Sequence, residues 1–271
     1  MRTRYQQKKA DYRVDISEGK EPTPIPLVCP TYVSLPNFTY ITDHLARVPP
    51  QQPGRIVGCR CTSCGPCCSC TKLANAISEE SAEQIIKDGI RSDDNLEPGF
   101  DFGIAEVRCS AHCKCSSTCV NKEVSNRSPP KLEIRYVNKD IGFGLFARAT
   151  IQKNRFIGSY VGELYVRSVF TKFADEHPYY YMVRPQLFKQ PVLIDALNFG
   201  NYTRFINHSC RPNVFTKNIY AGSNKLLPYP SFFASRKINE GEQIFLDYGP
   251  EYFASLGIQC QCGHCSGNAM D

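Results

Sequence analysis

The sequence predicts an α+β protein, mostly β, in which small sheets dominate and cysteine-rich segments flank them on both sides. Two observations predict this class. Short runs rich in β-branched and aromatic residues, separated by Gly, Asn, Asp and Pro, fill positions 131–249 and are typical of strands. Most of the 15 cysteines lie before or after this stretch, which indicates metal-bound modules.

Five runs predict strands, and one longer segment of the same region predicts a helix. The predicted strands are LEIRYV (132–137), GLFARA (144–149), FIGSYVGEL (156–164), PVLIDAL (191–197) and SFFASRKI (231–238). The predicted helix is YVRSVFTKFADEH, from Tyr165 to His177. A short helix is also predicted in SEESAEQIIKDG (78–89), where Ser81 and Gln84 have capping-box spacing.

Composition and charge narrow the class of protein. The 271 residues are 42% hydrophobic and 21% charged, an ordinary globular composition that suggests about two domains. Half of the net charge of +6 lies in residues 1–20, a basic head that either contacts nucleic acid or is simply solvated. No apolar run approaches the ~18 residues of a membrane span, and the polar N-terminus lacks a secretory signal, so we expect an intracellular protein with no membrane contact.

Cysteine spacing indicates zinc, because an intracellular chain disfavours disulfides. Two clusters together offer nine thiolates: Cys59, Cys61, Cys64, Cys68, Cys70, Cys109, Cys113, Cys115 and Cys119. Nine ligands satisfy three tetrahedral zinc ions when three of the thiolates bridge, so one trinuclear cluster fits. Two separate four-cysteine sites or buried thiols are the alternatives, and Cys67 competes with Cys68, which forms a second CxC step with Cys70.

A third cluster, CQCGHC, contributes Cys260, Cys262 and Cys265 and lacks a fourth thiolate. His264 is close in sequence, but adjacent residues do not easily face one tetrahedral ion. Cys210 is therefore the preferred fourth ligand, which would tie the C-terminal tail to the polar heptapeptide RFINHSC (204–210).

Four motifs follow one another between the cysteine clusters: GFG (142–144), YVGEL (160–164), RFINHSC (204–210) and FLDYG (245–249). Each is a weak indication alone, since GxG often marks a plain turn. Their order, after nine clustered cysteines and before CxCxxC, resembles the pre-SET, SET and post-SET modules of protein-lysine methyltransferases. The branch that acts on lysine 9 of histone H3 is the most similar.

The resemblance implies a fold of small sheets in which the NHSC segment is threaded under a loop as a pseudoknot. It divides the chain into a basic N-terminal segment (1–50), a pre-SET zinc-cluster domain (51–125), a SET catalytic domain (126–250) and a post-SET zinc module (251–271). It also implies three zinc ions in the pre-SET cluster and one in the post-SET site, all structural.

Site residues are implied by the same resemblance, position by position. S-adenosylmethionine would lie against Gly142, Phe143 and Gly144, be hydrogen-bonded by Asn207 and His208, and be enclosed by Arg204 and Tyr179. The lysine channel would be lined by Tyr160 and Tyr248, with Tyr248 as the catalytic tyrosine. Cys210 would complete the post-SET zinc site.

The implied function is transfer of a methyl group from S-adenosylmethionine to a histone lysine. The branch that the chain resembles most implies lysine 9 of histone H3, and a role in chromatin silencing in the nucleus. Partners would be the histone H3 tail and, through the basic N-terminus, nucleosomal DNA. Leu246 stands where relatives carry Phe or Tyr, so a roomier channel that permits di- or trimethylation is expected. The alternative is a catalytically inactive, zinc-stabilised chromatin-binding module.

Overall fold

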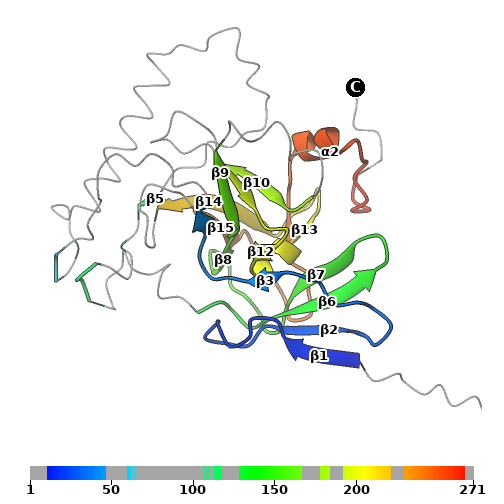
Figure 1. Cartoon of the computed structure of the whole chain (residues 1–271), viewed down its shortest axis with the longest axis horizontal. Coiled ribbons are helices and arrows are strands. Elements are labelled where there is room, and N and C mark those ends of the chain that lie inside the picture. Colours follow the sequence, from blue (N-terminus) through cyan, green and yellow to red (C-terminus); the bar gives the residue numbers. More distant parts are fainter. Residues whose placement is uncertain are drawn as a thin grey trace, which may run out of the picture.

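The computed structural model describes residues 11–46, 60–62, 64, 106–107, 109, 113–116, 128–166, 178–183, 192–220 and 229–265 (Figure 1). Strands dominate these residues and form several small sheets, as the sequence predicts. The helical elements among them are a short 3₁₀ helix, η3 (Tyr202–Phe205), and a helix of seven residues, α2 (Pro250–Leu256). No helix in these ranges has the length and hydropathy of a membrane span.

The first sheet joins the start of the described chain to the GFG motif. Its strand order is β1 (Asp11–Asp15), β2 (Pro26–Pro30), β6 (Leu132–Asn138) and β7 (Gly142–Ala147). Leu132 and Ile134 of β6 and Leu145 of β7 are fully buried on one face, as alternating strand residues should be. The strand predicted from LEIRYV is confirmed, and the predicted GLFARA strand begins two residues earlier, at Gly142.

Two further four-stranded sheets are connected by the segment that contains the YVGEL motif, which runs from the end of β8 into β9. One has the order β10 (Tyr180–Val183), β11 (Val192–Asp195), β9 (Glu163–Val166) and β4 (Leu45–Ala46). The other has the order β5 (Glu106–Val107), β14 (Val214–Tyr220), β15 (Tyr229–Ala234) and β8 (Phe156–Ser159).

Two short parallel pairs complete the strands. β3 (Thr39–Tyr40) pairs with β12 (Phe199–Gly200), and β13 (Asn207–His208) pairs with β16 (Phe245–Leu246). In the second pair, Asn207 lies opposite Phe245 and His208 opposite Leu246. This pairing brings NHSC against FLDYG, the contact that the predicted pseudoknot requires.

Residues 11–46 supply strands to three of the sheets, and three of these strands pair with segments far along the chain. β2 pairs with β6, β3 with β12 and β4 with β9, all in parallel. One apolar cluster extends from Ile25 and Leu27 to Ile244 and Leu246, and Phe156, Ile219 and Phe233 form another. The predicted domain boundaries remain a prediction.

The predicted helix at 165–177 is wrong at its start. Tyr165 and Val166 are the last residues of β9, where they lie opposite Leu193 and Val192 of β11. Backbone pairing with β11 overrides the helical composition of the segment. Residues 167–177, and the helix predicted at 78–89, lie outside the described residues.

The run FIGSYVGEL forms two strands, β8 and β9, rather than one. The break falls at Gly162, where an added Cβ would lie 2.2 Å from the backbone oxygen of Asp195. Only glycine allows the two backbones to approach so closely. This approach sets the direction of the segment that carries Tyr160.

Candidate functional site

The two residues of β13, Asn207 and His208, connect the GFG motif with the FLDYG motif. The side-chain amide of Asn207 donates a hydrogen bond to the carbonyl of Phe143, with a nitrogen to oxygen distance of 3.0 Å. The imidazole Nδ1 of His208 accepts a hydrogen bond from the backbone N–H of Tyr248 at 3.1 Å. Successive side chains of a strand point to opposite faces. The strand β13 can therefore contact the GFG motif through Asn207 and Tyr248 of the FLDYG motif through His208.

The GFG motif offers backbone rather than side chains. Gly142 has a φ of 75°, and an added Cβ there would meet no atom within 4 Å. Gly144 is crowded, because a Cβ would lie 2.3 Å from Nε2 of Gln243 and 3.1 Å from Nδ2 of Asn207. An open, side-chain-free edge at Gly142, with an amide anchored beside it, fits a polar cofactor that lies against the backbone.

Tyr248 packs against the rings of Tyr252 and His208. Its hydroxyl donates a hydrogen bond to the carbonyl of Ile206, and its ring is 4.6 Å from the ring of Tyr252, edge to face. Burial raises the pKa of the Tyr248 phenol well above its ordinary value, and the neighbouring Tyr252 and Tyr179 add to this. The phenol therefore stays protonated.

Tyr160 follows β8 and is buried, with 7% of its surface exposed. Its ring lies 5.6 Å from the ring of Tyr181 and edge-on to Phe232. Burial raises the pKa of its phenol well above the usual range, against an opposing effect of Arg204, and Tyr248 raises it further. Both predicted channel tyrosines are therefore neutral hydroxyls near pH 7.

Arg204 and Tyr179 form a stacked pair. The guanidinium carbon of Arg204 lies 3.9 Å from the centre of the Tyr179 ring and 4.4 Å from that of Phe38. Its Nε donates to the carbonyl of Ala196 at 2.8 Å, and its Nη2 to that of Leu197 at 3.3 Å. Burial lowers the pKa of this guanidinium. The contacts of Arg204 are those of a residue that braces the turn after β11.

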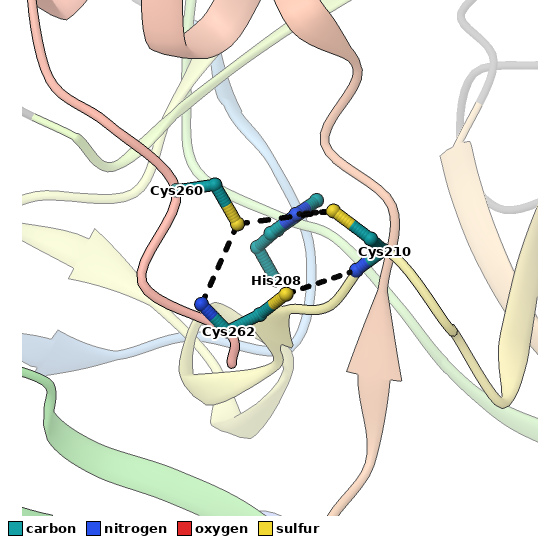
Figure 2. A group of neighbouring side chains, drawn as sticks. All are labelled: His208, Cys210, Cys260 and Cys262. Carbon is teal, nitrogen blue, oxygen red and sulfur yellow. Dashed lines mark hydrogen bonds between the residues drawn. The ribbon is translucent and has the colours of Figure 1, made fainter. Parts of the chain in front are cut away.

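The third cysteine cluster closes on Cys210, as Figure 2 shows. The sulfurs of Cys210 and Cys260 are 3.8 Å apart, and those of Cys262 and Cys265 are 3.9 Å apart. A tetrahedral zinc ion with Zn–S bonds of ~2.3 Å places its sulfurs ~3.8 Å apart, so both sulfur pairs have the spacing of zinc ligands. Metal-binding atoms of His208, Cys210, Cys260 and Cys262 all lie within 4.8 Å of one another, so the imidazole of His208 also lies within this group. His264 instead directs Nδ1 to the hydroxyl of Ser209, at 3.5 Å.

Backbone donors support negative charge on the sulfur of Cys262, whereas burial and the neighbouring thiols raise the pKa of Cys210 and Cys260. The N–H groups of Cys210 and His264 donate to the sulfur of Cys262 at 3.5 and 3.4 Å, and the N–H of Cys262 donates to that of Cys260 at 3.4 Å. Although burial opposes it, these donors lower the pKa of the Cys262 thiol to about 5. A thiolate is the form that binds zinc.

The two earlier cysteine clusters also meet. Metal-binding atoms of Cys64, Cys109 and Cys115 lie within 4.8 Å of one another, and the backbone N–H of Ser116 donates to the carbonyl of Thr62. Within the described residues no cysteine forms a disulfide. The other predicted ligands of this cluster are Cys61 and Cys113, which are described, and Cys59, Cys68, Cys70 and Cys119, which lie outside the described residues, as does Cys67.

Sequence reasoning missed the residues that α2 adds to the site. Tyr252 packs on Tyr248, and Phe253 lies edge-on to His208 with the ring centres 4.7 Å apart. The sequence does carry a helix signal here, because proline is typical of the first turn of a helix and glycine of its C-terminal cap. In the structure Pro250 lies in the first turn and Gly257 has the left-handed conformation of the cap. Gln243, which contacts the position of Gly144, carried no comparable signal.

Comparison with known proteins agrees with this geometry. Residues 142–249 match the family described as SET domain. Over 264 residues the chain is 30% identical to histone-lysine N-methyltransferase EHMT1 of Mus musculus, covering 92% of this chain and 19% of the relative. Over 248 residues it is 29% identical to histone-lysine N-methyltransferase SUV39H2 of Xenopus tropicalis, covering 84% of this chain and 58% of the relative.

Solved structures share the fold across nearly the whole chain. Arabidopsis thaliana SUVH6, crystallised in complex with SAM, is 26% identical and has a TM-score of 0.69, covering 97% of this chain and 57% of that one. The methyltransferase domain of human SETMAR is 24% identical, with a TM-score of 0.68 over 94% of this chain and 97% of that one.

Fold, motif order and the family match together identify residues 142–249 as a SET domain. Among proteins with this domain, the chain is similar to the Su(var)3-9 type: it is 28% identical over 248 residues to histone-lysine N-methyltransferase Su(var)3-9 of Drosophila melanogaster, covering 84% of this chain and 38% of the relative. The chain spans about a fifth of EHMT1 and just over half of SUV39H2.

Proposed function

We propose that this chain transfers a methyl group from S-adenosylmethionine to the side chain of a histone lysine. The observation that carries the proposal is a pair of hydrogen bonds made by the adjacent residues Asn207 and His208. Asn207 donates to the carbonyl of Phe143, and His208 accepts from the backbone N–H of Tyr248. They support the proposal because they connect the backbone of the GFG motif, where a nucleoside cofactor would lie, with a protonated, buried tyrosine. S-adenosylmethionine supplies an electrophilic methyl group on a sulfonium, so no covalent enzyme intermediate is needed.

The protein must then position the substrate lysine and remove one proton from its ammonium group. A lysine ammonium has a pKa of about 10.4, so at pH 7 the neutral amine costs roughly 4 to 5 kcal/mol. Aromatic walls from Tyr160, Tyr181 and Tyr252 disfavour the charged form by removing water. A cationic cofactor beside the amine would lower its pKa in the same direction.

Tyr248 would then orient the amine. Its hydroxyl hydrogen is donated to the carbonyl of Ile206, so the phenol oxygen has lone pairs to offer. An N–H of the incoming amine can donate to that oxygen, which turns the nitrogen lone pair away from the tyrosine. Holding two reactants in line in this way can account for a large part of a methyl-transfer rate.

We further propose the histone H3 tail as substrate, with lysine 9 as the preferred site. The Su(var)3-9 and EHMT1 relatives support the histone substrate, since their names describe histone-lysine methyltransferases. A Candida albicans relative, 33% identical over 165 residues and named H3 lysine-36 specific, makes lysine 36 the competing site. The protein would accordingly act on chromatin in the nucleus, with residues 1–20 near nucleosomal DNA.

Zinc has a structural role in this proposal. Sites made of cysteines alone are closed and leave no position for a reactant. We propose one ion at Cys210, Cys260, Cys262 and Cys265 and three ions at the nine-cysteine cluster. The tail ion would hold α2, and with it Tyr252, against the lysine channel.

The test is incubation with labelled S-adenosylmethionine and histone H3 tail peptides. Wild type should label the peptide at lysine 9, and Tyr248→Phe should lose nearly all of this activity. Tyr229→Phe is the matched control, because the Tyr229 hydroxyl donates to Asp43 and the residue lies in β15, outside the proposed channel. Peptide binding without label in any variant would select the inactive chromatin-binding module.

A further inference from the structure

The imidazole of His208 contacts both the tail cysteines and the strand that carries Tyr248. Its Nε2 lies 3.4 Å from the sulfur of Cys210, and its Nδ1 accepts the backbone N–H of Tyr248 at 3.1 Å. The carboxylate of Asp247 lies 3.6 Å from the same Nδ1 and is well exposed. The side chain of His208 is nearly buried, with 10% of its surface exposed.

The tautomer follows from these contacts. A nitrogen that accepts a hydrogen bond carries no hydrogen, so the neutral ring must carry its hydrogen on Nε2. That hydrogen points at the Cys210 sulfur, which lies 3.4 Å away and can accept it. One ring therefore donates to a proposed zinc ligand and accepts from the backbone of the proposed catalytic residue.

We propose that His208 is a positioning residue that couples the tail zinc site to Tyr248, an inference that rests on the proposed function for the role of Tyr248. Zinc bound by the tail cysteines would hold the Cys210 sulfur in place, and the 3.4 Å contact would then hold the ring of His208. The ring then fixes the backbone at position 248, and with it the direction of the phenol.

The surroundings of the ring make this coupling rigid. The ring packs edge-on against Phe253 at 4.7 Å and lies 5.5 Å from the ring of Tyr248. The backbone on either side is held too, because His208 lies opposite Leu246 and the N–H of Ser209 donates to the carbonyl of Leu246. A change of ring orientation must therefore displace the tail or the 245–248 segment.

The first experiment measures the coupling without enzyme activity. Hydrogen exchange of the Tyr248 amide is followed in the full chain, as wild type and as Cys260→Ser, which removes one tail ligand. We expect one zinc ion fewer in the variant and about 10-fold faster exchange at position 248, since partners that orient metal ligands typically contribute 10- to 100-fold. Equal exchange rates in the two proteins, with the zinc ion lost, would overturn the proposal.

The second experiment separates the two ring contacts. In His208→Asn the amide oxygen stands near the position of Nδ1, and the N–H toward Cys210 is lost. In His208→Gln the amide can reach Cys210, and the acceptor for Tyr248 is lost. We expect the Asn variant to keep protection at position 248 that no longer depends on tail zinc, and the Gln variant to lose that protection.

Kinetics add a readout that a purely structural role would not move. We expect kcat of His208→Gln to fall roughly 10- to 100-fold with a much smaller change in KM for the histone peptide. His208→Asn should recover part of kcat. His264→Asn is the control, because His264 belongs to the same tail and contacts Ser209 rather than Tyr248.

Zinc content decides between positioning and direct ligation. His208→Asn should retain every zinc ion, whereas a loss equal to that of Cys260→Ser would make His208 a ligand and overturn the proposal. If wild type transfers no methyl group while the exchange results hold, the proposed function fails and the coupling stands. Normal methyl transfer with unchanged exchange at position 248 would overturn the coupling and leave the proposed function standing.

Discussion

The side-chain amide of Asn207 is anchored on the carbonyl of Phe143, 3.0 Å away, so the NHSC segment holds the backbone of the GFG motif directly. Asn207→Ala removes this donor and leaves a part-buried carbonyl without it. A hydrogen bond of this kind contributes about 1 to 1.5 kcal/mol, so we expect the KM for S-adenosylmethionine to rise roughly 10-fold. Isothermal titration with S-adenosylmethionine checks this, and unchanged affinity would contradict the assignment of the GFG motif.

Gly162→Ala should destabilise the protein strongly. Its Cβ would lie 2.2 Å from a backbone oxygen of Asp195, and a backbone cannot move aside as a side chain can. We expect a loss of about 3 kcal/mol in the free energy of unfolding, from chemical denaturation. Gly144→Ala is the comparison: its Cβ meets the movable end of Gln243, so stability should change less while cofactor affinity falls.

Arg204→Lys should lower stability in the absence of any cofactor. Lysine cannot reproduce the flat stacking on Tyr179 or the two hydrogen bonds to Ala196 and Leu197. The expected loss is roughly 1 to 3 kcal/mol in the free energy of unfolding. Arg236→Lys, at an exposed ion pair with Glu242, should lose under about 1 kcal/mol. Normal stability with weakened cofactor binding would favour the role first predicted for Arg204.

Leu246 should permit more than one methyl transfer. It is buried in β16 beside His208, and it lacks the hydroxyl with which a tyrosine would hold a water molecule in the channel. We expect di- or trimethylated product from wild type and mainly monomethylated product from Leu246→Tyr. Mass spectrometry of the peptide at long reaction times is the measurement, and wild type that stops at one methyl group would refute the expectation.

Activity should rise with pH and keep rising past the point where ordinary phenols begin to ionise. Burial raises the pKa values of both Tyr160 and Tyr248, so both groups lose their protons only above the ordinary value of about 10. Deprotonation of the substrate lysine should therefore dominate a profile of kcat/KM between pH 7 and pH 10. A decline with an apparent pKa below 9 would contradict the protonated tyrosines.

Much of the site could be predicted from sequence because it consists of short motifs. GFG, NHSC and FLDYG are local, and β13, β16 and β7 bring them together as the resemblance implies. The strands from LEIRYV and PVLIDAL were also predictable from alternation and β-branched composition. The start of the predicted helix at Tyr165 failed because pairing with β11 outweighs local propensity.

Other features depend on contacts that no local pattern encodes. Arg204 donates hydrogen bonds to the carbonyls of Ala196 and Leu197 because the fold brings η3 against the turn after β11. The parallel pairing of residues 27–46 with positions more than a hundred residues later is equally invisible in short windows. Parallel pairs close long loops, and composition alone does not select the partner.

Those early strands have a consequence for the order in which the molecule can assemble. During synthesis, β2, β3 and β4 emerge before their parallel partners β6, β12 and β9, and the edges that those partners cover stay unpaired until more than a hundred further residues have followed. Long-range parallel pairing folds slowly and is prone to aggregation while edges are bare. Removal of residues 1–46 should therefore take strands from three sheets at once and give an insoluble product, even though every motif of the SET domain is still in the polypeptide.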